Sequence, residues 1–215
     1  MVDVKICGLS TSESIDAAIN AGADLVGLVF YLKSPRNVSL QRAKVLADQA
    51  RGRAKIVALI VDADDAAIKS INDTVAPDLF QAHGSETPRR VQDIRALTAK
   101  PVIKAIKVAA ASDIDLAAAY ADKASLILYD AKAPETLVNA LPGGNGLAFD
   151  WNLLGSSSQS EGFILSGGLN PDNVARAIRV TGAPIVDVSS GVEFAPGKKD
   201  LGLIRKFIEA AKAAR

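Results

Sequence analysis

Two glycine-bearing turns near the end of the chain carry the residue types that bind phosphate groups. The first is Ser166-Gly167-Gly168-Leu169-Asn170-Pro171 and the second is Asp187-Val188-Ser189-Ser190-Gly191, and each directly follows a short apolar run. Glycine lets backbone N–H groups approach an anion closely, and an Asn-Pro pair is typical of the electropositive start of a helix. The two turns therefore predict a phosphate site formed by Gly167, Gly168, Asn170, Ser189, Ser190 and Gly191.

Cys7, the only cysteine, ends the first apolar run of the chain. Side chains alternate along a strand, so Asp3, Lys5 and Cys7 share one face, which we expect to line the inside of the sheet. A thiol with a pKa near about 8.5 acts as a base only if its thiolate is stabilised, and Lys5 is the candidate for that role. A lone cysteine can also be a small buried hydrophobe, but its place at the end of a strand favours chemistry.

Three further polar residues follow predicted strands. His83, the only histidine, shares a face with Gln81 and is either a substrate contact or a structural histidine. Asp130 follows four apolar residues, and an ionisable group in such a place has a chemical task or serves as a helix cap or ion-pair partner. Arg36 follows Pro35 in a polar loop, where its guanidinium either binds a carboxylate through two nitrogens or is solvated.

The chain alternates apolar, β-rich runs with amphipathic helical runs, which would bring the ends of the strands together. The predicted strands are Val2–Cys7, Leu25–Phe30, Lys55–Val61, Leu79–His83, Val102–Val108, Ser125–Asp130, Gly162–Ser166 and Ile185–Ser189. The predicted helices are Ser12–Asn20, Leu40–Ala50, Asp64–Asn72, Pro88–Leu97, Asp113–Tyr120, Pro171–Val180 and Leu201–Ala214. This order predicts an α/β fold with a parallel sheet. Eight strands without a G-x-G-x-x-G turn favour a closed (β/α)₈ TIM barrel over an open doubly wound sheet.

Local signals place the starts of three helices and one long loop. Ser10 and Glu13 predict a capping box, Thr87-Pro88 predicts a helix start, and Asn170-Pro171 predicts an N-cap followed by the first helical residue. The loop at 131–147 is long and contains Gly143-Gly144-Asn145-Gly146, which is typical of a lid or of a flexible surface turn.

Composition limits the kind of protein that this chain can be. Its 215 residues are 49% hydrophobic with no linker-like break, which predicts one domain over 1–215. The net charge of +1, with dispersed Lys and Arg, predicts no nucleic-acid partner. One cysteine, no signal sequence and no long apolar run predict a cytoplasmic protein without a membrane partner. We expect a monomer rather than a homodimer. The lack of clustered ligand-type residues predicts no metal site.

Motifs along nearly the whole chain resemble the phosphoribosylanthranilate isomerase family of tryptophan biosynthesis. The resemblance rests on their order and positions: Lys5-Ile6-Cys7-Gly8-Leu9, Gly27-Leu28-Val29-Phe30, Ser34-Pro35-Arg36, Gln81-Ala82-His83-Gly84, Val102–Ile106, Asp130, Gly143–Gly146, Phe149-Asp150-Trp151, Ser166–Pro171, Val186–Glu193 and Pro196–Asp200. Two departures are Asn145, where the family usually has threonine or serine, and Ser166, where alanine is common.

The resemblance implies a TIM-barrel isomerase that performs an Amadori rearrangement without a metal or organic cofactor. It implies that Asp130 is the general acid, that Cys7 is the general base, and that Arg36 holds the anthranilate carboxylate of a phosphorylated substrate. The two glycine turns would hold the phosphate, while His83, Lys5 and Asp187 complete the predicted substrate site.

Other functions remain open at this stage. A histidine-pathway isomerase would use the same chemistry, but that family typically places an aspartate on its first strand. A non-catalytic barrel that binds a phosphometabolite would not need both Cys7 and Asp130. A Schiff-base aldolase is disfavoured because Lys104 and Lys107 lie on opposite faces of one strand, so at most one points inward.

Overall fold

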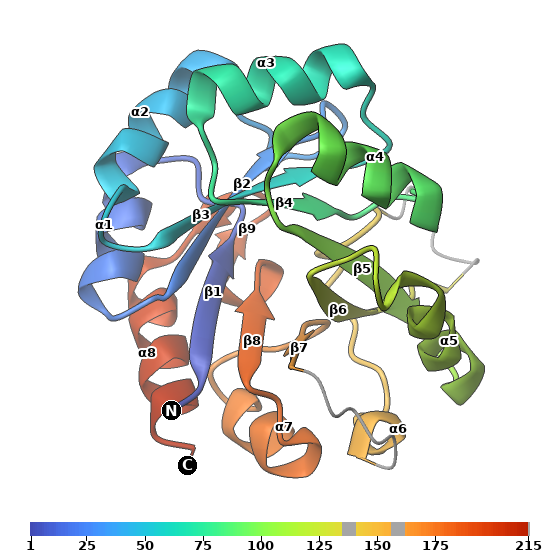
Figure 1. Ribbon diagram of the computed structural model, residues 1–215. Helices are drawn as coiled ribbons and strands as arrows, with labels where there is room; N and C mark the ends of the chain where they lie inside the picture. Colours follow the sequence, from blue (N-terminus) through green and yellow to red (C-terminus); the bar gives the residue numbers. More distant parts are fainter. Residues whose placement is uncertain (135–140, 156–161, 215) are drawn as a thin grey trace.

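The computed structural model describes residues 1–134, 141–155 and 162–214, and a closed parallel barrel lies at its centre. The barrel strands are β1 (Asp3–Cys7), β2 (Leu25–Phe30), β3 (Lys55–Ile60), β4 (Leu79–Ala82), β5 (Val102–Val108), β6 (Leu126–Ala131), β7 (Phe163–Leu165) and β8 (Ile185–Val188). Helices surround these strands, and the two ends of the chain lie close together near α8 (Leu201–Lys212) (Figure 1). The predicted (β/α)₈ barrel is confirmed, and the open sheet is excluded.

The pairing of β1 with β8 closes the barrel. Lys5 lies in register with Asp187, and neighbours in register point to the same face of a sheet. Both side chains are buried, and Nζ of Lys5 lies 2.8 Å from Oδ1 of Asp187. An ion pair inside the barrel therefore joins its first and last strands.

The remaining helices are α1 (Ser12–Asn20), α2 (Leu40–Ala50), α3 (Asp65–Val75), α4 (Pro88–Thr98), α5 (Ala111–Asp115), α6 (Asn152–Gly155) and α7 (Val174–Thr181). The predicted bounds of α1 and α2 agree with the structure. Thr87 caps α4 as predicted, because its side chain accepts a hydrogen bond from the N–H of Arg90. The predicted capping box at Ser10 and Glu13 is wrong, since Thr11 and Ser14 form the box one residue later.

Other segments also differ from the predictions. α7 begins at Val174 rather than Pro171, because the Asn170 side chain accepts from the N–H groups of Asp172 and Asn173 and forms a separate turn. The predicted helix Asp113–Tyr120 is instead α5 followed by a 3₁₀ helix, Leu116–Tyr120. The short helix α6 and the hairpin of β9 (Glu193–Ala195) and β10 (Lys198–Lys199) were not predicted.

Two apolar layers stabilise the barrel. One lies between the strands and the helices and contains large buried side chains such as Phe80, Tyr129 and Phe207. The other fills the interior below the mouth and consists of Leu25, Val57, Leu79, Ile103, Ala105, Leu128 and Ile164. The filled interior leaves space for a ligand only at the mouth, where the strands end.

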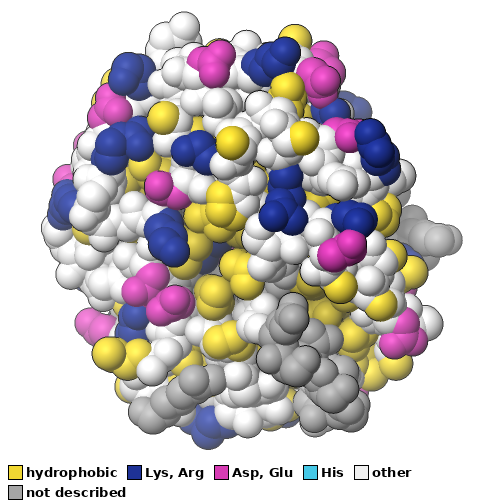
Figure 2. Space-filling view, in the orientation of Figure 1, with side chains coloured by type: hydrophobic (Ala, Val, Ile, Leu, Met, Phe, Trp, Pro, Cys, Tyr) yellow, Lys and Arg dark blue, Asp and Glu magenta, His cyan; other side chains and the backbone are white. Residues whose placement is uncertain are grey.

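Figure 2 shows Lys and Arg interspersed with Asp and Glu over one face of the molecule, without a stripe of one sign among the described residues. Among the described residues, no helix has both the length and the apolar character to cross a membrane.

The buried ion pair predicts a large effect on stability. Lys5→Met would leave the Asp187 carboxylate buried without its partner, and we expect the free energy of unfolding to fall by about 3–5 kcal/mol. Urea denaturation measures this change. Adding Asp187→Asn should restore part of the loss, whereas Lys44→Met, at an exposed pair with Asp48, should change stability little. An equal effect of Lys5→Met and Lys44→Met would contradict the argument.

Candidate active site

A pocket lies at the C-terminal mouth of the barrel, lined by the ends of the strands and the loops that follow them. The predicted site residues that line it are Cys7, Arg36, His83, Asp130, Gly167, Gly168, Asp187, Ser189 and Ser190. Lys5 lies buried beneath it, and Asn170 and Gly191 are not among its lining residues. The structure thus brings together residues from the first, second, fourth, sixth, seventh and eighth strands or the loops that follow them.

Cys7 ends β1 above the buried Lys5–Asp187 pair. Burial raises the pKa of the Cys7 thiol, and Asp187 adds to this, while Lys5 and Lys199 act in the opposite direction without reversing it. The pKa of Lys5 is raised: burial lowers it, but the charges of Asp187 and Cys7 outweigh that effect. The hydroxyl of Ser166 also donates to Asp187, with 3.3 Å between Ser166 Oγ and Asp187 Oδ2. Lys5 is therefore largely neutralised by Asp187 and does not by itself produce a thiolate.

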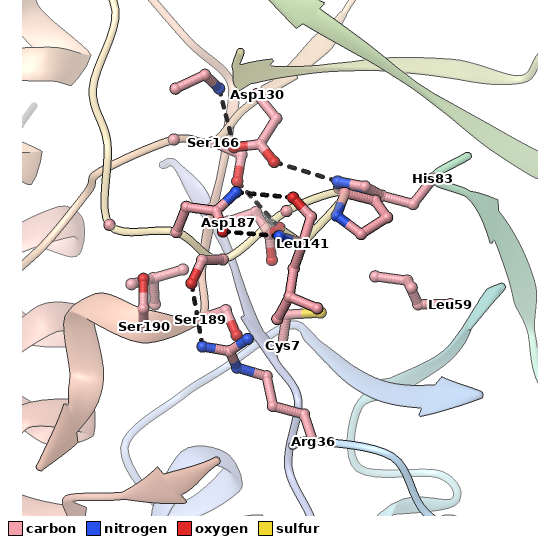
Figure 3. A pocket seen from close by; sticks show the side chains of 18 of the residues that line it. Cys7, Arg36, Leu59, His83, Asp130, Leu141, Ser166, Asp187, Ser189 and Ser190 are labelled. Atoms are coloured by element: carbon pink, nitrogen blue, oxygen red, sulfur yellow. Dashed lines mark hydrogen bonds and ion pairs between the residues drawn. The ribbon is translucent and has the colours of Figure 1, made fainter. Parts of the chain in front are cut away.

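Asp130 and His83 form a buried pair on the other side of the pocket, and Figure 3 shows their side chains directed at one another. The distance from His83 Nε2 to Asp130 Oδ2 is 3.1 Å, and the distance from Gln81 Nε2 to His83 Nδ1 is 2.7 Å. With the Gln81 amide in this orientation its nitrogen donates to Nδ1 of His83, which corresponds to the tautomer with the ring proton on Nε2. His83 is then a donor to Asp130, whose Oδ1 accepts from the N–H of Ala131.

Arg36 enters the pocket from the loop after β2, and Glu193 binds one edge of its guanidinium. Nε and Nη2 of Arg36 lie 2.8 Å and 2.9 Å from the two carboxylate oxygens of Glu193. Nη2 also donates to the carbonyl oxygen of Gly144 at 3.2 Å. The side chain is buried and ion-paired, so the alternative of a solvated arginine is wrong. Of the three guanidinium nitrogens of Arg36, only Nη1 has no bond to Glu193, so this nitrogen is the one available to bind a ligand.

Glu193 and Lys199 are functional candidates that the sequence reasoning did not single out. Nζ of Lys199 lies 2.7 Å from Oε1 of Glu193 and 2.8 Å from the carbonyl oxygen of Ser189. Burial lowers the pKa of Lys199 to about 8, although Glu193 opposes this change. Burial opposes ionisation of Glu193, but hydrogen bonds from Arg36 and the charge of Lys199 hold its pKa below the usual range. The Pro196-Gly197 pair, a turn signal, could have predicted the hairpin that carries both residues.

The two glycine turns present backbone donors to the pocket. In the part of the chain that the structure describes, the N–H groups of the lining residues Gly167, Gly168 and Ser190 have no hydrogen-bond acceptor. Such a group of free donors can bind an anion. Gly191 does not line the pocket, and its role in binding phosphate stays a prediction. The Asn170 side chain is instead engaged in its own turn, and its role in binding phosphate stays a prediction.

The glycines of the first turn also have a packing role. A Cβ on Gly168 would lie 2.6 Å from the nitrogen of Ala148, and one on Gly167 would lie 2.5 Å from the nitrogen of Ala131. Both glycines have positive φ angles, of 85° for Gly167 and 63° for Gly168. A larger residue at either position would therefore displace neighbouring backbone as well as obstruct an anion.

Residues 141–147 of the long loop predicted at 131–147 line or border the pocket. Asn145 closes this segment, since its side chain accepts from the N–H of Leu141 and donates to the Leu141 carbonyl. A Cβ on Gly143 would lie 2.5 Å from Nε2 of His83 and 2.8 Å from Oδ2 of Asp130. The segment thus covers the His83–Asp130 pair closely, while residues 135–140 of the same loop lie outside the described residues.

An apolar wall formed by Cys7, Val29 and Leu59, with Tyr31 and Val61 packed against it, occupies the β1–β3 side of the pocket. Arg36 follows this wall, whereas the free backbone donors lie on the β7–β8 side. The arrangement suits a ligand with a flat apolar group and an anion at one end and a phosphate at the other.

Comparison with known proteins identifies the family. The family model of N-(5'-phosphoribosyl)anthranilate (PRA) isomerase matches residues 4–210. The chain belongs to this family. It is 54% identical to the N-(5'-phosphoribosyl)anthranilate isomerase of Rhodopseudomonas palustris (strain BisB5), over 99% of this chain and 97% of the relative. The corresponding isomerase of Parvibaculum lavamentivorans is 50% identical over 99% of both chains.

Solved structures of the PRA isomerase family agree with this assignment. The isomerase of Thermotoga maritima superposes with a TM-score of 0.88 at 37% identity, covering 99% of both chains. A second structure, of the isomerase in complex with reduced 1-(o-carboxyphenylamino)-1-deoxyribulose 5-phosphate, has a TM-score of 0.85 at 35% identity, again over 99% of both chains.

The surroundings of Cys7 predict an unreactive thiol in the ligand-free protein. Only the thiolate is alkylated, so the rate of labelling by iodoacetamide should rise with pH and reach half its maximum above about pH 8.5, the midpoint for an ordinary thiol. Mass spectrometry over a pH series measures this rate, and Cys7→Ala, which leaves no cysteine, is the blank. A midpoint at or below that of a free thiol would contradict the structure.

Proposed function

We propose that this chain converts N-(5'-phosphoribosyl)anthranilate to 1-(2-carboxyphenylamino)-1-deoxyribulose 5-phosphate, an Amadori rearrangement in the synthesis of tryptophan. The observation that carries the proposal is that a possible acid, Asp130, and a possible base, Cys7, line one pocket in a member of this isomerase family. The relative that binds the reduced product provides further support.

Asp130 is the proposed general acid. Opening the ribose ring requires a proton on the ring oxygen, after which the C1–O bond breaks and the anthranilate nitrogen forms a protonated imine at C1. Asp130 supplies the proton and becomes a carboxylate. The donors at His83 Nε2 and at the N–H of Ala131 then stabilise that carboxylate, and neither has to move to do so.

Cys7 is the proposed general base. Removing the proton at C2 of the imine sends the C2–H electrons into a new C1–C2 double bond, which neutralises the nitrogen and gives an enolamine. This enol form then becomes the ketone by taking up a proton at C1 and losing the O2 proton. Although the thiol has a raised pKa before the reaction, the positive imine formed in the first step favours the thiolate beside it.

Binding groups at the two ends of the substrate orient these steps. The Nη1 side of Arg36 would bind the anthranilate carboxylate, with the ring on the apolar wall of Cys7, Val29 and Leu59. The backbone donors around Gly168 and Ser190 would bind the phosphate. With both ends fixed, the ribose carbons would lie between Cys7 and Asp130, which line the same pocket. Orientation of this kind lowers the barrier without any cofactor.

The proposal includes the organisation, location and partners of the protein. We expect a single domain over 1–215, a cytoplasmic monomer, and no metal, organic cofactor or nucleic-acid partner. One solved relative is described as monomers generated from the dimeric isomerase of Thermotoga maritima, so association states differ within the family. Light scattering in solution determines the state of this chain.

The direct test is incubation with freshly made N-(5'-phosphoribosyl)anthranilate while the loss of its fluorescence is followed. We expect turnover by the parent protein and a fall in kcat of about 10²- to 10⁴-fold for Cys7→Ala and for Asp130→Asn, the usual contribution of one acid or base. Circular dichroism establishes that the variants are folded. An inactive parent protein would refute the function, and a nearly normal Cys7→Ala would refute the role of Cys7.

Arg36→Lys tests the carboxylate site. A lysine keeps the charge but cannot hold Glu193 through two nitrogens and also present a third to the substrate. We expect a rise in KM of about 10-fold or more with a smaller change in kcat, measured in the same assay. Arg89→Lys, whose side chain is 81% exposed on α4, is the control and should leave both constants unchanged. Unchanged kinetics for Arg36→Lys would remove Arg36 from the substrate site.

A further inference from the structure

The carboxylate of Glu193 has a hydrogen-bond donor in every direction. Oε1 accepts from Nε of Arg36 and Nζ of Lys199, while Oε2 accepts from Nη2 of Arg36 and, at 3.1 Å, from the N–H of Gly197. Its side chain is only 4% exposed. A buried carboxylate with four donors has one favourable orientation, so it also fixes the orientation of the guanidinium that it binds.

Lys199 connects this carboxylate to the other end of the pocket. Its Nζ donates to Glu193 and also to the carbonyl oxygen of Ser189, at 2.8 Å, with Oγ of Ser189 at 3.3 Å. Ser189 directly precedes Ser190, which lines the pocket and whose N–H is one of the proposed phosphate donors. The side chain of Lys199 is 2% exposed, so its ammonium has exchanged water for these protein oxygens. The neighbouring Lys198 is exposed, so the two lysines have different environments.

We propose that Glu193 and Lys199 form a positioning pair that holds the guanidinium of Arg36 and the main chain at Ser189 in fixed relation to each other. The inference rests on the proposed function, since it sets the distance between the groups that would bind the carboxylate and the phosphate of one substrate. Neither residue of the pair lines the pocket, and each acts through a residue that does.

The pair has a second consequence, for the charge near Cys7. Arg36 and Lys199 carry two positive charges and Glu193 carries one negative charge, so the group is cationic when Lys199 is protonated. Lys199 lowers the pKa of Cys7, as does Lys5, whereas Asp187 raises it. Arg36, His83 and Asp130 line the same pocket as Cys7. Lys5 is bonded directly to Asp187, so removing Lys199 takes away the other of the two lysines that lower the pKa of Cys7.

The first experiment measures binding by calorimetric titration with reduced 1-(o-carboxyphenylamino)-1-deoxyribulose 5-phosphate. We expect Glu193→Gln and Lys199→Met each to weaken binding about 10-fold or more, the scale found for partners that orient a binding group. Lys198→Met, on the adjacent exposed position, is the matched control and should bind as the parent does. In turnover, the two variants should raise KM more than they lower kcat. Binding by both variants equal to that of Lys198→Met would overturn the proposal.

The double variant Glu193→Gln/Lys199→Met tests whether the two residues act as one device. If they do, the double variant should bind the reduced product about as weakly as the weaker single variant. If the fold-losses in affinity of the two single variants multiply in the double variant, the two residues contribute independently, which would overturn the pairing.

The pH dependence of Cys7 alkylation separates this role from general loss of structure. Below pH 8, where Lys199 of the parent protein is still protonated, the labelling rate of Lys199→Met should be lower than that of the parent, because a cation beside the thiol has been removed. Loosening of the barrel would expose the thiol and raise that rate instead, which would overturn the proposal. Lys198→Met should label at the parent rate. This readout needs no turnover, so an inactive parent protein would refute the proposed function without deciding the role of the pair.

Discussion

The ion pair between Lys5 and Asp187 is the interaction on which the site depends. It joins the first and last strands of the barrel, lies 182 residues apart in sequence, and is buried directly beneath the mouth. A buried charge is tolerated only when it is paired, so each residue requires the other. The Asp187 carboxylate also neutralises the positive charge of Lys5, so the pair below Cys7 has a net charge close to zero. Any net positive charge at the mouth has to come from elsewhere in the fold, and the group of Arg36, Lys199 and Glu193 supplies it.

The sequence predicted the barrel well because the alternation of side chains within each strand shows which residues face the interior. Alternation along Val2–Cys7 placed Lys5 and Cys7 inside, and alternation in the fourth strand placed Gln81 and His83 on one face. The same logic put Lys104 and Lys107 on opposite faces. In the structure Lys104 lies outside the barrel, where it bonds Glu86, while Lys107 is in register with Asp130. Such assignments need only the period of two residues in a strand.

What the sequence could not predict are the partners. Arg36 and Glu193 are 157 residues apart, and nothing local to either residue indicates that the carboxylate would occupy two nitrogens of the guanidinium. The predicted start of α7 was wrong for a related reason. Asn170-Pro171 carries a helix-start signal, but the side chain of Asn173 also bonds the Gly168 carbonyl, and the two asparagines together form a turn before the helix. Competing local hydrogen bonds of this kind are decided by the surrounding structure rather than by propensity.

The same charges impose an order on the proposed chemistry. In the ligand-free protein burial keeps Cys7 a poor base, and an anionic substrate at the mouth would favour the thiol still more. At Asp130, His83 and the N–H of Ala131 are in place to donate to the carboxylate that forms once the proton has passed to the ring oxygen. Ring opening therefore precedes removal of the C2 proton, and the positive imine made in the first step supplies the charge that the second step lacks. A thiol that was already ionised would not need this order of steps, since the thiolate would be available before the imine had formed. The raised pKa of Cys7 would thus link its proposed role as a base to the presence of the intermediate on which it would act.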